Sequence, residues 1–60
     1  MDDASEVERV AAEYVARHGL RALTDLQERA EMAAETGDRL SADAWTDIAE
    51  AAARLLKRNR

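Results

Sequence analysis

The chain contains no proline, and its only two glycines, Gly19 and Gly37, divide it into three stretches. Proline breaks helix interiors, whereas glycine often occupies the left-handed position just after a helix ends. Fourteen of the 60 residues are alanine, the best helix former. Valine and isoleucine, which strands prefer, occur only four times together. The sequence therefore predicts an all-α fold with breaks at the glycines.

The spacing of apolar residues predicts three helices, over about residues 4–18, 20–36 and 41–58. In each stretch they recur every three or four residues, as in an amphipathic helix. The short connection after Gly37 predicts that the last two helices form a helical hairpin. We expect Ser41 to be the N-cap of the third helix, with Leu40 packing on Trp45. One kinked helix through Gly19 remains an alternative, because glycine inside a helix costs only about 1 kcal/mol relative to alanine.

The length fits a single small helical domain, residues 1–60, with a small core. Cysteine is absent, so neither disulfides nor thiolate metal sites can stabilise it. The second half of the middle stretch presents alanine, which lets another helix approach closely. We therefore expect homodimerisation to complete the fold. The residues expected at a dimer or partner interface are Tyr14, Leu26, Ala30, Ala33, Trp45, Ile48, Ala52 and Leu55.

The charge and the start of the chain indicate a cytoplasmic protein. A formal net charge of −4 disfavours binding to nucleic-acid backbones and favours solubility. Met1 is followed by Asp2 and Asp3, where a signal peptide would carry basic residues. No uncharged apolar run approaches the roughly 20 residues that span a bilayer. We expect no membrane span.

The sequence predicts no catalytic, metal-binding or cofactor-binding residue. His18 is the only histidine, and no second ligand or nucleophile stands at a spacing that would specify a site with it. The carboxylates lie on outward faces, with Asp43 one turn from Asp47 and Glu31 one turn from Glu35. Neither a calcium loop nor a glycine-rich phosphate loop is present. We therefore expect a protein that is not an enzyme and has no cofactor.

Two classes of binding function remain. The first is a protein–protein interaction or regulatory module that acts through a helical surface. Trp45 would anchor either the core or a partner, and a symmetric dimer core would satisfy both roles. The alternative is a small nucleic-acid-binding regulator that uses the basic residues 54–60. A helix-turn-helix reader is disfavoured, because Asp43, Asp47 and Glu50 lead the outer face of the third stretch.

Four short motifs lie between about Val7 and Leu56: Arg-His-Gly at 17–19, Glu-Arg-Ala at 28–30, Gly-Asp at 37–38, and Trp45 followed by Ile48. In these motifs the chain resembles a group of short, uncharacterised proteins from alphaproteobacteria. The resemblance implies a single helical hairpin that ends in an alanine- and leucine-rich helix, and a bacterial cytoplasmic origin. It implies no activity and no functional residues.

Overall fold

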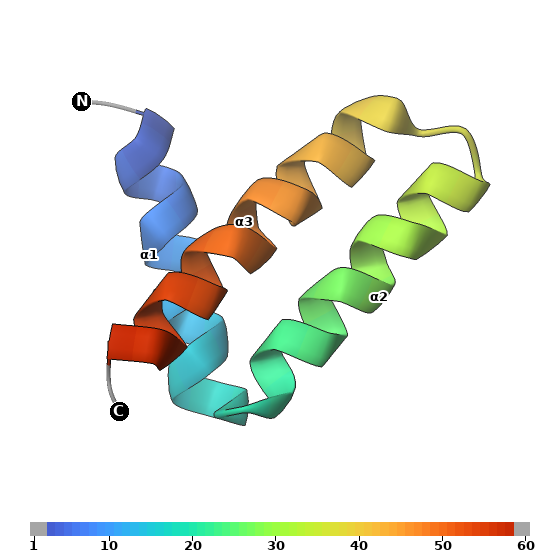
Figure 1. Cartoon of the computed structure of the whole chain (residues 1–60). Coiled ribbons are helices and arrows are strands. Elements are labelled where there is room, and N and C mark those ends of the chain that lie inside the picture. Colours follow the sequence, from blue (N-terminus) through green and yellow to red (C-terminus); the bar gives the residue numbers. More distant parts are fainter. Residues whose placement is uncertain (1–2, 59–60) are drawn as a thin grey trace.

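A computed structural model describes the backbone of residues 3–58 and the side chains of residues 6–58. This part of the chain is formed by three helices and contains no strand: α1 (Asp3–His18), α2 (Arg21–Glu35) and α3 (Arg39–Arg58) (Figure 1). The predicted all-α class and three-helix order are confirmed, and the main change in bounds is the earlier start of α3. None of the three helices has the length and apolar character needed to cross a membrane.

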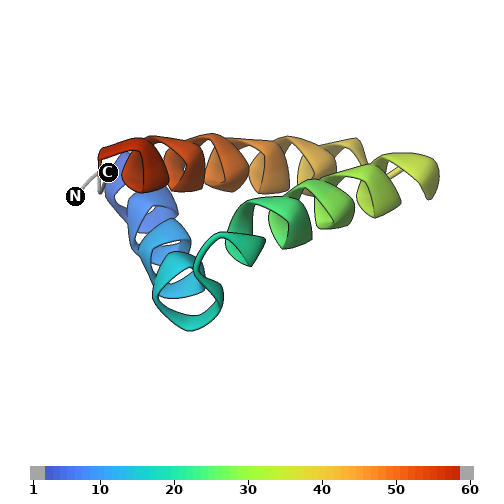
Figure 2. The same cartoon turned by 60° about the horizontal axis from the view of Figure 1, so that its bottom comes forward.

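The three helices are arranged around α3. α2 and α3 form the predicted antiparallel hairpin and share the largest interface, whereas α1 packs mainly on α3 and only slightly on α2. Figure 1 shows α1 crossing behind the C-terminal half of α3. In Figure 2, α1 and α2 diverge from their junction, and the turn end of the hairpin extends beyond α1. The backbone of α1 therefore does not extend along the turn end of the hairpin.

The core is made mostly of alanine. Leu26 is the only large side chain that is fully buried among the described residues. The other buried residues are Ala11, Ala22, Ala49, Ala51 and Ala52. Larger apolar side chains pack around this centre and stay half-buried: Val7, Tyr14, Val15, Leu23, Trp45, Ile48 and Leu55. Because alanine is short, the helices approach one another closely but enclose little apolar volume.

The turn between α2 and α3 is a complete Schellman ending. Gly37 has a positive φ of 83°, which glycine adopts without steric cost. Its N–H donates to the carbonyl oxygen of Ala34 at 3.1 Å, and the N–H of Asp38 donates to that of Ala33 at 2.9 Å. These two bonds satisfy carbonyls that the end of a helix leaves free.

Asp38 is the N-cap of α3. Its Oδ1 accepts a hydrogen bond from the backbone N–H of Ser41 at 3.1 Å. Hydrogen bonds from the Ser41 hydroxyl and backbone N–H lower the pKa of Asp38. The predicted N-cap at Ser41 is wrong, because Asp38 directly follows the Schellman turn and reaches the free N–H three residues later. Leu40 is 83% exposed, so its predicted packing on Trp45 is wrong too.

Gly19 separates α1 from α2. It has a positive φ of 62°, and its N–H donates to the carbonyl oxygen of Val15 at 2.8 Å. The N–H of Ala22 then donates back to the carbonyl oxygen of Gly19 at 3.0 Å, and the Leu20 side chain provides no cap for α2. The alternative of one kinked helix is therefore wrong, because a left-handed residue ends the helical hydrogen-bond pattern.

Candidate functional site

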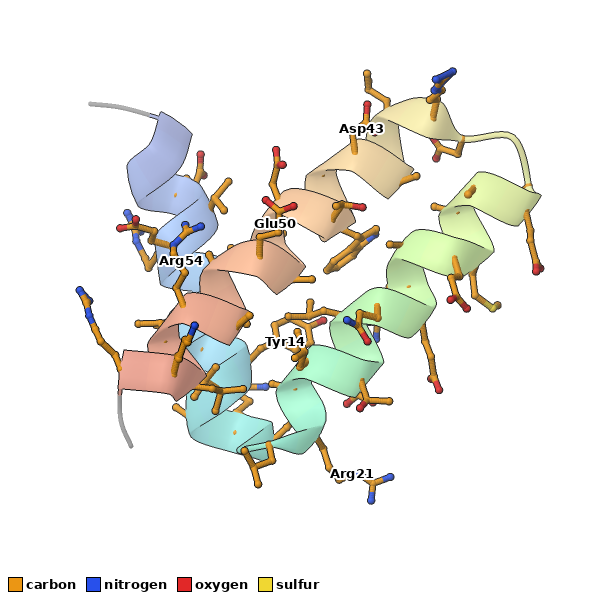
Figure 3. All side chains as sticks on the ribbon, viewed as in Figure 1. Tyr14, Arg21, Asp43, Glu50 and Arg54 are labelled. Atoms are coloured by element: carbon orange, nitrogen blue, oxygen red, sulfur yellow. The ribbon has the colours of Figure 1, made fainter. Side chains whose placement is uncertain are left out.

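The only tryptophan, tyrosine and histidine of the chain form one aromatic cluster. The rings of Tyr14 and Trp45 meet edge to face, with centroids 6.2 Å apart and planes at 79°. His18 lies one turn along α1, with its ring centroid 5.7 Å from that of Tyr14. Figure 3 shows Tyr14 in the angle between α2 and α3. An edge-to-face contact is favourable for aromatic rings, so Tyr14 links α1 to the hairpin.

Arg29 of α2 covers the indole of Trp45. Its guanidinium carbon lies 5.3 Å from the ring centroid, within the range of a cation–π interaction. Trp45 is half-buried. On α2, Ala30 and Ala33 carry short side chains, and α1 reaches the indole through the edge-to-face contact of Tyr14. A long, exposed arginine therefore provides part of the cover.

A surface hollow of about 390 Å³ lies beside the indole. We call its lining the Trp45 surface, and it consists of Asp25, Glu28, Arg29, Met32 and Trp45. Met32 is 65% exposed and is one of three large apolar side chains that the described residues expose, together with Leu20 and Leu40. The surface thus combines two apolar side chains with two carboxylates and one guanidinium. It is chemically suited to packing against another protein, with charged groups at the rim.

A second hollow, of about 300 Å³, adjoins the Trp45 surface and shares Asp25 and Arg29 with it. Tyr14 and the exposed His18 also line it, and so do Glu13 and Arg17. Its lining includes two carboxylates and two guanidinium groups. In the described part of the chain, no three histidine, cysteine or acidic side chains are grouped so that they could hold a metal ion.

Two of the residues expected at an interface belong to the intramolecular core instead. Leu26 and Ala52 are 0% exposed, so neither presents surface to a partner. Both belong to the buried core cluster, together with Ala11 of α1. The other expected interface residues are half-buried: Tyr14, Ala30, Ala33, Trp45, Ile48 and Leu55.

Sequence reasoning did not identify Arg29 and Met32 as parts of the site. A signal for Met32 was present, because a methionine on the polar face of an amphipathic helix has no role in the core. Arg29 follows Asp25 by one helical turn and looks like half of an ordinary ion pair. Its position over Trp45 depends on how α2 packs on α3, which no local pattern specifies.

The outer face of α3 changes from acidic to basic along the helix. Asp43, Asp47 and Glu50 are exposed, and Arg54 follows one turn after Glu50. Figure 3 shows Asp43, Glu50 and Arg54 along this helix. At the basic end, Arg54, Lys57 and Arg58 line another hollow. The last two residues of the predicted basic segment, 59–60, lie outside the described residues.

Comparisons with family models, curated proteins and solved structures found no significant match to this chain. The resemblance to the alphaproteobacterial proteins stays a prediction. The chemistry of the surface is therefore what supports a function.

Proposed function

We propose that the protein is a non-enzymatic protein–protein interaction module, and that it binds a second copy of itself through the Trp45 surface. The observation that carries this proposal is the half-buried Trp45, with Arg29 over its ring and the exposed Met32 lining the same hollow. Tryptophan, arginine and methionine are enriched at protein interfaces, and tryptophan and arginine dominate their binding energy.

The small core supports a second copy as the partner. Among residues 6–58, Leu26 alone is both large and fully buried, so one chain removes little apolar area from water on folding. Burying Trp45 and Met32 against another copy adds the apolar contact that the monomer lacks. Small domains without disulfides or metals commonly gain stability in this way.

The charges of the Trp45 surface also permit self-association. In a two-fold contact, a residue away from the axis meets a different residue of the other copy. The surface carries Asp25 and Glu28 together with Arg29, so the guanidinium of one copy can approach a carboxylate of the other. A surface with charges of one sign only would repel its own copy.

Sedimentation equilibrium at micromolar concentrations tests this proposal. We expect the wild-type chain to be a dimer, and Met32→Glu to weaken its association by at least about tenfold, because a carboxylate would be buried at the contact. Leu20→Glu is the matched control. Leu20 is 80% exposed, does not line the Trp45 surface and gains the same charge. A wild-type chain that stays at 6.7 kDa, or equal weakening by both substitutions, would contradict the proposal.

A further inference from the structure

A hollow of about 510 Å³ lies between α1 and the C-terminal half of α3. We call it the cationic hollow, and its lining is Glu8, Ala51, Arg54, Leu55, Lys57 and Arg58. Ala51 is 2% exposed and Leu55 is half-buried, whereas the three cationic side chains are exposed. The hollow thus has an apolar base and a positively charged rim, with one carboxylate contributed by α1.

The charge of this hollow is opposite to that of the chain as a whole, which has a formal net charge of −4. Lys57 and Arg58 lie in the last turn of α3, where cations complement the helix dipole. Arg54 lies one turn earlier, so the helix dipole does not explain why a cation occupies that position. Asp47 and Glu50 precede Arg54 on the same helix and limit the positive potential to this end. Such a potential attracts anionic groups over a short distance only.

We propose that the cationic hollow binds a short acidic amphipathic helix of a partner protein. An apolar stripe on that helix would cover Leu55, and carboxylates beside the stripe would reach Arg54 and Arg58. A nucleic-acid strand fits less well, because phosphates gain nothing from an apolar base and a long polyanion would extend over Asp47 and Glu50. The hollow shares no residue with the Trp45 surface, so this inference is independent of self-association.

Fluorescence anisotropy with a designed probe tests the proposal on the full chain. The probe is a labelled peptide of roughly 14 residues, with leucine on one helical face and glutamate and alanine on the others. A peptide of the same composition, shuffled so that the stripe is lost, is the control. We expect saturable binding of the probe only, with amide chemical-shift changes centred on Ala51 and Leu55.

Charge-removing variants identify the site. Arg54→Gln with Arg58→Gln should weaken probe binding by at least about fivefold, because two rim cations are lost. Arg21→Gln with Arg39→Gln removes the same charge at exposed positions elsewhere and should change binding by less than about twofold. No saturation below about 1 mM, equal binding of the shuffled peptide, or shifts centred on Trp45 would overturn the proposal. Stronger competition by a DNA duplex would overturn it in favour of the nucleic-acid alternative.

Discussion

Gly19 and Gly37 each end a helix in the left-handed conformation, although the hydrogen bonds at the two helix ends differ. Both have positive φ, and a Cβ added at either position would meet no atom within 4 Å. A side chain there would therefore cost backbone strain and create no clash. In one kinked helix, the alternative that the sequence leaves open, Gly19 would lie inside the helix and a substitution there would cost less than one at the turn residue Gly37. The observed break at Gly19 removes that difference.

We accordingly predict that Gly19→Ala and Gly37→Ala destabilise the fold by similar amounts, about 1 kcal/mol each. This is the cost of holding a residue other than glycine in the left-handed conformation. Gly37→Asn should cost less than Gly37→Ala, since asparagine tolerates this conformation better. Urea unfolding monitored by circular dichroism measures all three. A Gly19→Ala variant as stable as the wild type would contradict the break at Gly19.

Asp38 makes part of the stability depend on pH. Its pKa is lowered in the folded state, so the stabilisation is present above the ordinary pKa of 3.8 and is lost as pH falls through the lowered value. Asparagine caps helices about as well without titrating. We predict that wild type loses more thermal stability than Asp38→Asn between about pH 5 and pH 3. Asp38→Ala should lower the melting temperature at pH 7 by roughly 5 °C. Parallel pH profiles for wild type and Asp38→Asn would exclude this capping role.

Close packing of α3 on its neighbours depends on alanine at its inner face. Ala52 is fully buried, whereas Ala44, two turns earlier on the same helix, is exposed. We predict that Ala52→Leu destabilises the fold by about 1–3 kcal/mol, because added methylenes force the helices apart. Ala44→Leu adds the same atoms and should change stability by less than about 0.5 kcal/mol. Thermal melts compare the two, and equal effects would show that α3 does not pack through Ala52.

The helices could be predicted from the sequence because their signals are local. Alanine content, three-residue and four-residue spacing, and two glycines are sufficient to place α1, α2 and α3 within a few residues. The start of α3 was misplaced because Ser41 and Asp38 are both good caps, and the Schellman turn at Gly37 decides between them. The contact of Arg29 with Trp45 was not predictable, because it joins two helices whose relative rotation is set by packing.

The whole molecule is an open arrangement in which α3 packs against both other helices. α3 packs on α2 along the hairpin and on α1 at its C-terminal half, while α1 and α2 diverge (Figure 2). This leaves two surfaces with different chemistry. The Trp45 surface is apolar with mixed charge at its rim, and the cationic hollow is apolar with mostly positive charge at its rim. A 60-residue chain with so little enclosed volume is better suited to presenting surfaces than to enclosing a substrate.

Iodide quenching of Trp45 fluorescence, measured across protein concentrations, tests the central claim most directly. Trp45 is the only tryptophan, so the signal comes from this one indole. Its half-buried position predicts clear quenching in dilute samples, and a second copy covering the indole predicts that quenching decreases as concentration rises through the dissociation constant. Met32→Glu should stay quenchable over the same range. Quenching that does not change with concentration, in samples shown to be dimeric, would place the dimer contact elsewhere and contradict the account.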